Sequence, residues 1–119
     1  MGMFGFSTRS LGRDRETDFS RFTRMQTTLG QVLAEIEREK AGLRKRFTDT
    51  SADAALTLEA MSGQNDTNAY ESRLDDLTVS IQGYEQRIMF LDTQLEFVEG
   101  ILGSIGSFVR EHRLMGNNS

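Results

Sequence analysis

The side chains best suited to chemistry in this chain are its one histidine, His112, and a series of carboxylates at Asp92, Glu96 and Glu99. The carboxylates are spaced by four and three residues, so a helix would bring them close together. Carboxylate-bridged metal sites in helical bundles, however, take inward-facing Glu ligands and Glu-x-x-His pairs from several helices. We therefore interpret the three acids as a solvated face and expect no metal ligand and no cofactor.

Catalysis and nucleic-acid binding find little support in the remaining residues. The chain has no cysteine, no His-Glu-x-x-His motif and no glycine-rich phosphate loop. Arg44, Lys45 and Arg46 form the one basic cluster, in a chain of net charge −4 without aromatic residues between the cations. We expect a non-enzymatic protein with no catalytic residue and no nucleic-acid partner, in which His112 is an interface or surface residue.

The elements that would position these side chains are helices. From Tyr70 to His112, apolar residues alternate at spacings of four and three, which is the heptad period of a coiled coil. A second such pattern begins near Asp14, and the chain contains no proline to interrupt either one. In the first pattern along the chain, Ala54, Leu58 and Met61 continue the apolar stripe beyond Phe47.

The stretch between the two patterns predicts a tight turn at residues 62–68. Gly63 suits the left-handed position after a helix, and Asn68 followed by Glu71 fits a capping box, with Asp66 and Thr67 as competing caps. We thus predict a flexible N-terminal tail at 1–13, a helical hairpin at 14–113 and a C-terminal tail at 114–119. Its helices would cover about 14–61 and 69–113.

Folding the chain back at this turn brings the two stripes into phase. If Met61 faces Tyr70, then Leu43 faces Ile88 and Phe22 faces Val109. The same register places Arg46 opposite Glu85 and Arg38 near Asp92. The predicted fold is therefore all-α, a long antiparallel two-helix coiled-coil hairpin that assembles into a four-helix or larger bundle. We name its predicted helix contact the seam, which contains Phe22, Leu29, Ile36, Leu43, Phe47, Ile81, Tyr84, Ile88, Leu95, Leu102 and Val109.

Charge is unevenly distributed along the chain. Residues 1–48 carry ten basic and six acidic side chains, and residues 49–119 carry four and twelve. Two oppositely charged segments in one small chain attract each other, so we expect them to pair within the hairpin.

Beside the seam, the second helix carries a further apolar row formed by Phe90, Phe97, Ile101 and Phe108. We call these residues the phenylalanine row. The first helix has nothing comparable, and an uncovered apolar row usually marks an interaction surface. The expected cover is a second copy or another helical protein, and the alternatives are the N-terminal tail with Phe4 and Phe6, or a membrane surface.

The row overlaps an uncharged stretch, residues 100–109, in which Gly100, Gly103 and Gly106 each weaken a helix by about 1 kcal/mol relative to Ala. This stretch is too short to span a bilayer, so we expect no transmembrane segment, although peripheral membrane contact stays open. The predicted function is that of a cytoplasmic interaction protein, an assembly subunit or adaptor. Acidic helical hairpins are also similar, in shape alone, to export chaperones and helical substrates of bacterial flagellar and type III secretion systems, which gives the alternative.

Overall fold

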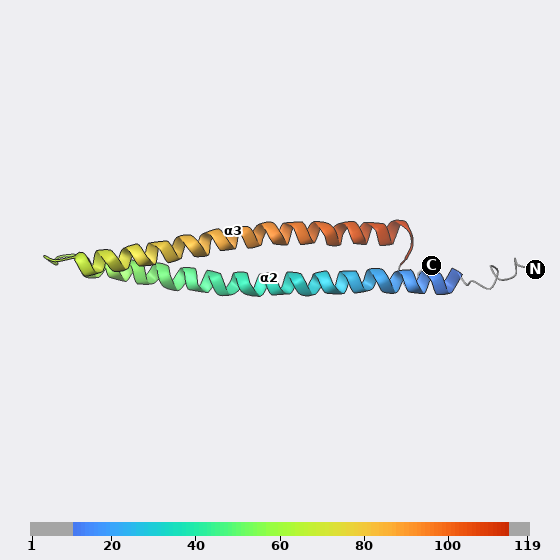
Figure 1. Ribbon diagram of the computed structural model, residues 1–119, viewed down its shortest axis with the longest axis horizontal. Coiled ribbons are helices and arrows are strands. Elements are labelled where there is room, and N and C mark those ends of the chain that lie inside the picture. Colours follow the sequence, from blue (N-terminus) through green and yellow to red (C-terminus); the bar gives the residue numbers. More distant parts are fainter. Residues whose placement is uncertain (1–10, 115–119) are drawn as a thin grey trace, which may run out of the picture. The chain divides into compact units, whose positions relative to one another are not determined.

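The computed structural model describes residues 11–114, which form two helices joined by a turn. Helix α2 spans Leu11–Met61 and helix α3 spans Asn68–Glu111, and the described part of the chain contains no strand (Figure 1). The fold is an all-α helical hairpin, as predicted. Within residues 11–114, neither helix carries an apolar run of the length needed to cross a membrane.

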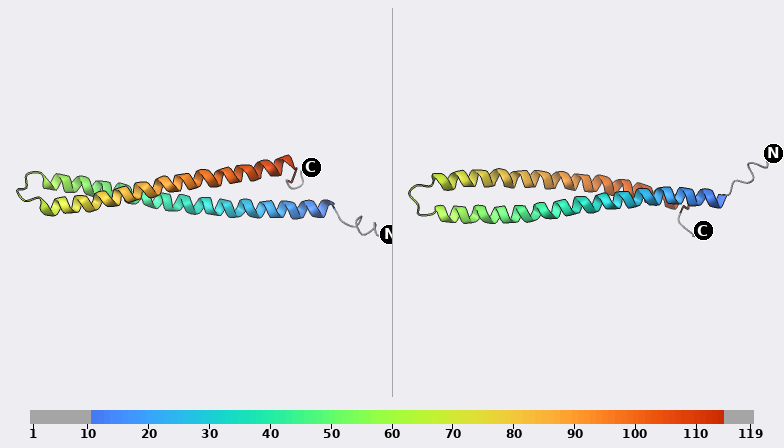
Figure 2. Two further views of the ribbon diagram at one scale, coloured as in Figure 1. Left: turned by 45° about the horizontal axis from the view of Figure 1, so that its top comes forward. Right: turned by 60° about the horizontal axis from the view of Figure 1, so that its bottom comes forward.

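The described residues fall into two compact units, each with segments of both helices. Unit 2 is Glu35–Leu95 and contains the turn. Unit 1 combines the described residues up to Ala34 with those from Glu96 onward. In each unit the segment of α2 lies beside an antiparallel segment of α3, as the three views of the chain agree (Figures 1 and 2).

The turn in unit 2 is set by Gly63, whose φ of 83° lies in the left-handed region that favours glycine. The N–H of Gln64 donates to the carbonyl of Met61 at 3.1 Å and ends α2 there. The prediction for Gly63 is confirmed. Of the three candidate caps, Asn68 is excluded because it is already helical, and the competing candidates Asp66 and Thr67 accept the hydrogen bonds at the helix start. The Asp66 carboxylate accepts the N–H of Asn68 at 3.1 Å, and the Thr67 carbonyl accepts the N–H of Glu71 at 2.9 Å.

The core of unit 2 is apolar, with one buried polar residue among the described residues. Ile36, Leu43, Leu91 and Leu95 are buried, and Leu91 is only 1% exposed. Thr57 is also buried and donates its hydroxyl to the Asp53 carbonyl at 2.8 Å. A buried hydroxyl needs such an acceptor, because an unpaired one costs about 1–3 kcal/mol.

The expected stripe is corrected here, because Leu58 is exposed and Thr57 takes the inward position. The reason is the heptad spacing. Thr57 follows the buried Leu43 by fourteen residues, which is two heptads, so it stays in step with the helix contact, and Leu58 lies one residue out of that step.

Ion pairs join the two helices of unit 2. Lys40 pairs with Asp92, Arg87 donates to Glu39 at 2.8 Å, and Arg73 donates to Asp53 at 2.7 Å. Asp92 therefore pairs with Lys40 instead of the expected Arg38. The pair of Lys40 with Asp92 fits the expected pairing of a basic first half with an acidic second half. The other two pairs do not, since Arg87 and Arg73 both come from the second half.

Unit 1 is held together by aliphatic and aromatic side chains. Val98, Ile105 and Val109 of α3 are buried. The ring of Phe22 stacks on the ring of Phe108, with centroids 5.0 Å apart. Such a pair contributes about 0.5–1.5 kcal/mol beyond the area it buries.

Helix α3 ends within unit 1 in a Schellman motif. The N–H of Leu114 donates to the Val109 carbonyl at 2.9 Å, and the N–H of Arg113 donates to the Arg110 carbonyl at 3.2 Å. Arg113 accordingly has a positive φ of 54°. The Arg113 carbonyl accepts a hydrogen bond from Arg15 of α2 at 2.7 Å.

The helix bounds differ by a few residues from those expected. Helix α2 as described begins at Leu11 instead of 14, and Asp14 in its first turn suits the positive end of the helix dipole. Helix α3 occupies Asn68–Glu111 instead of 69–113, because the Schellman motif ends it at Glu111. The predicted flexibility of the tails concerns residues 1–10 and 115–119, which lie outside the described residues.

Candidate functional site

The phenylalanine row does not form one uniform surface. Phe97 is 70% exposed and Phe90 is 57% exposed, whereas Ile101 is half-buried. Phe108 is partly exposed but packs its ring on Phe22. Phe90 belongs to unit 2, and the other three belong to unit 1. The row therefore contains two largely exposed side chains, Phe90 and Phe97, and one, Phe108, that also contributes to the contact between the helices.

Phe97 stands on an uncharged part of α3. The residues three, four and seven positions away share its side of the helix and carry no charge. They are Phe90, Thr93, Gln94, Gly100, Ile101 and Ser104. An exposed phenylalanine whose own side of the helix carries no charge is a feature of an interaction surface.

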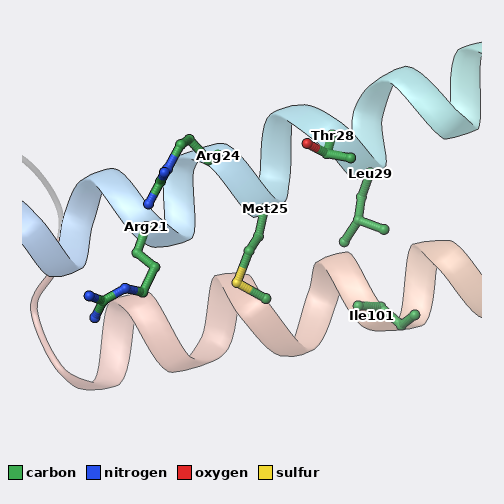
Figure 3. A pocket seen from close by; sticks show the side chains of 6 residues that line it. All are labelled: Arg21, Arg24, Met25, Thr28, Leu29 and Ile101. Atoms are coloured by element: carbon green, nitrogen blue, oxygen red, sulfur yellow. The ribbon is translucent and has the colours of Figure 1, made fainter.

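A groove of about 510 Å³ lies between α2 and α3 in unit 1, beside Ile101. Met25 and Leu29 extend from α2 toward α3, where Leu29 approaches Ile101 (Figure 3). Arg21, Arg24 and Thr28 complete the lining on the α2 side. We name this site the arginine-rimmed groove. Ile101 connects it to Phe97, which precedes Ile101 by one helical turn.

The two arginines of the groove differ in their contacts. The guanidinium of Arg21 lies 3.3 Å from the Asp18 carboxylate, and both side chains are largely exposed. Arg24 donates its Nε hydrogen to the Ser20 carbonyl at 3.4 Å, and the structure pairs it with no carboxylate within residues 11–114. No carboxylate lines the groove. Its rim is therefore cationic and its floor apolar.

Packing inside the hairpin does not require glycine at positions 100 and 103. A methyl group added at either position would meet no atom within 4 Å. Each glycine nevertheless costs the helix about 1 kcal/mol relative to Ala. A small residue that the hairpin itself does not need is consistent with close approach of something outside it.

None of the seam residues is exposed. Ile36, Leu43, Leu95 and Val109 are buried. The half-buried ones are Phe22, Leu29, Phe47, Ile81, Tyr84, Ile88 and Leu102. The contacts of Phe22 with Phe108 and of Lys40 with Asp92 each lie within one residue of the predicted register.

The residues considered for chemistry are exposed. His112 stacks on Phe108 with ring centroids 4.1 Å apart, and its Nδ1 lies 3.0 Å from the Phe108 carbonyl oxygen. Asp92, Glu96 and Glu99 are exposed, and Asp92 is engaged by Lys40. Across residues 11–114, no three His, Asp or Glu side chains are placed to hold a metal ion.

One ion pair shifts the titration of its members. The hydrogen bond from Arg87 lowers the pKa of the Glu39 carboxyl below its ordinary value, and the same bond raises the pKa of Arg87. Both groups are at the surface, so the shift reflects pairing between the helices and not burial in a site.

Some residues of the site and its frame were missed from the sequence. Arg21 and Arg24 were not predicted, because the apolar spacing of the second helix gives no information on charged residues of the first helix. The available signal is their position, since Arg21 precedes the apolar Met25 by four residues and Arg24 precedes it by one. Lys40 was missed in the helix contact because its charge suggested the solvated face.

Together these features define a class, an all-α helical hairpin that exposes aromatic side chains beside an arginine-rimmed groove. No protein-family model matches the chain. No curated protein matches it. No solved structure matches it either.

Proposed function

We propose that this is a non-enzymatic interaction protein, which self-associates or docks another helical protein through the exposed part of the phenylalanine row. The observation that carries the proposal is Phe97, 70% exposed on a side of α3 without charge. Burying a phenylalanine side chain contributes about 1.5–3 kcal/mol, so a partner that covers Phe97 gains substantially. As an assembly subunit or adaptor, the protein needs no cofactor and no nucleic acid.

The glycines support a helical partner. Gly100 lies one turn from Phe97, and a side chain there would meet only open space in the hairpin. Small residues allow two helix backbones to approach closely, as in packed bundles. A four-helix bundle formed by two hairpins uses both features, since Phe97 fills the contact and Gly100 admits the facing helix.

A membrane surface is the less favoured partner. Helices that lie on membranes combine their apolar face with a polar face rich in Lys and Arg. Glu96, Glu99 and Glu111 are instead exposed on α3 in this region, and an anionic bilayer repels them. The proposal therefore takes a protein partner, in the cytoplasm, in line with a chain that has no cysteine. A carrier role in a bacterial secretion system is a special case, in which the partner helix is a client.

Sedimentation velocity of the full chain tests the proposal. We expect the wild-type protein to sediment as a dimer or larger assembly, and Phe97→Asp to shift it toward the mass of a single chain, because a carboxylate cannot be buried unpaired at the contact. Met89→Asp is the matched control, since Met89 is similarly exposed on α3 and does not belong to the row. Far-UV circular dichroism verifies that the helices persist in each variant.

Flotation with phosphatidylserine-containing vesicles examines the membrane alternative. Monomeric wild-type protein that floats with vesicles and loses this binding on Phe97→Asp would contradict the proposal. An unchanged sedimentation profile in Phe97→Asp would also count against the row as the contact.

A further inference from the structure

Two exposed surfaces of the hairpin are opposite in charge. One is the arginine-rimmed groove of unit 1, with Met25, Leu29 and Ile101 as its apolar floor. The other lies in unit 2 on α3, where Val79 is 68% exposed and Asp75 and Asp76 precede it by four and three residues. We name this second surface the Val79 edge.

The Val79 edge is an acidic counterpart to the groove. On a helix, residues three and four positions before Val79 flank it on the same side, so Asp75 and Asp76 border its exposed side chain. Both acids are exposed, and within residues 11–114 the structure pairs neither with a cation. Gln82 and Gly83 lie at the equivalent positions after Val79 and are uncharged. The edge therefore presents an aliphatic side chain between carboxylates.

The groove has the matching arrangement. Arg21 precedes Met25 by four residues, as Asp75 precedes Val79, and Arg24 lies beside it without a carboxylate partner in the described chain. Methionine adapts its flexible side chain to the shape of an incoming residue. An apolar groove with charged borders is the usual receptor for one face of an amphipathic helix.

We propose that the arginine-rimmed groove of one copy binds the Val79 edge of a second copy, with Arg21 and Arg24 opposite Asp75 and Asp76. Charge complementarity selects this occupant. The groove lining contains two arginines, of which Arg21 also contacts Asp18, and no carboxylate. The edge offers carboxylates and no cation. Each chain carries both surfaces, so every copy is donor and acceptor at once. This inference rests on the proposed function and specifies its partner.

Charge reversal in pairs tests the contact. Arg21→Glu/Arg24→Glu makes the groove acidic, and Asp75→Arg/Asp76→Arg makes the edge basic. Each double variant alone faces like charges, and we expect self-association, measured by sedimentation velocity at low salt, to weaken about tenfold or more. In an equimolar mixture, the acidic groove meets the basic edge and the native groove meets the native edge. The mixture should regain association close to wild type, now between unlike chains.

Arg38→Glu/Arg44→Glu is the control, since it changes net charge equally at exposed residues of unit 2 outside both surfaces. It should retain wild-type association. Raising the salt concentration should weaken the wild-type assembly and the restored mixture alike, because both depend on exposed charges. Circular dichroism measures the helix content of each variant, which distinguishes a lost contact from an unfolded chain.

The outcomes separate this inference from the proposed function. Double variants that associate like wild type, or a mixture that stays as weak as its members, overturn the groove and edge contact. If Phe97→Asp still dissociates the assembly in that case, the proposed function stands with another contact. A wild-type chain that remains single up to millimolar concentration overturns the second copy as partner, while a different helical protein would still satisfy the proposed function.

Discussion

The two units of this hairpin join the same pair of helices by different means. In unit 2, charged and hydroxyl side chains take part in the contact. Lys40 pairs with Asp92, and the buried Thr57 donates its hydroxyl to the Asp53 carbonyl of its own helix. In unit 1, the contact includes an aromatic stack of Phe22 on Phe108 and the buried Val98 and Ile105. The difference separates two tasks that a helix pair must perform, which are specifying its register and offering a surface.

An ion pair that crosses a helix contact favours one register, because a slip separates its two charges. Lys40 has a side chain only 14% exposed, and its ammonium reaches Asp92 in the observed register. Apolar contacts are more tolerant of a shift. Unit 1 accordingly carries the adaptable elements, Met25 in the groove and Phe97 outside it, where a partner is proposed to bind.

Among the tests of this comparison, removing apolar packing from unit 2 should change the free energy of unfolding most. Leu91→Ala removes the most deeply buried side chain described and should lower the free energy of unfolding by about 2–5 kcal/mol. Urea denaturation at a fixed protein concentration measures it. Met89→Ala, on the same helix but largely exposed, should stay within about 0.5 kcal/mol of wild type.

A small effect of Leu91→Ala would break the comparison, because the ion pairs of unit 2 would then be the main source of its stability. A large effect would sharpen it. Charges would then specify the register of a contact whose stability comes from burial in both units.

Much of this architecture is predictable from spacing. Two heptad stripes without proline predict two long helices, and the turn residues around Gly63 predict their reversal, so the helical hairpin follows from the sequence. The position of Gly63 after α2 was predictable because few other residues adopt a positive φ at low cost.

The features that escaped prediction are those in which composition and position disagree. Thr57 takes the inward position that hydrophobicity predicts for Leu58, because heptad phase outweighs residue type. Phe108 lies in the outer row by spacing, yet its ring is long enough to reach Phe22. The groove needs residues of both helices at once, and no pattern within one helix reveals which of them meet.

An intermediate effect is expected for the polar contribution to unit 2. Lys40→Ala removes the partner of Asp92 and the aliphatic stem of a mostly buried side chain, and should cost about 1 kcal/mol. Lys40→Leu should recover that loss or exceed it, because an apolar residue at a heptad position buries its surface without desolvating a charge. Thermal unfolding of the two variants measures the difference. Equal losses in both would assign the whole effect to the ion pair and none to packing.

The smallest expected effect concerns the exposed pair of Glu39 and Arg87. The hydrogen bond from Arg87 lowers the pKa of folded Glu39 below its value of about 4.3 in an unfolded chain. The unfolded state therefore binds the proton more readily, so the pair stabilises the fold above that pH and the stabilisation is lost as the pH falls through the lower, folded pKa. Glu39→Gln should thus be less stable than wild type near pH 7 and equal to it in strong acid, as measured by thermal unfolding across that range. In an Arg87→Met background, Glu39→Gln should lose this pH-dependent difference. If the difference persists there, a group other than Arg87 lowers the pKa of Glu39, and the pair contributes nothing to the polar character of unit 2.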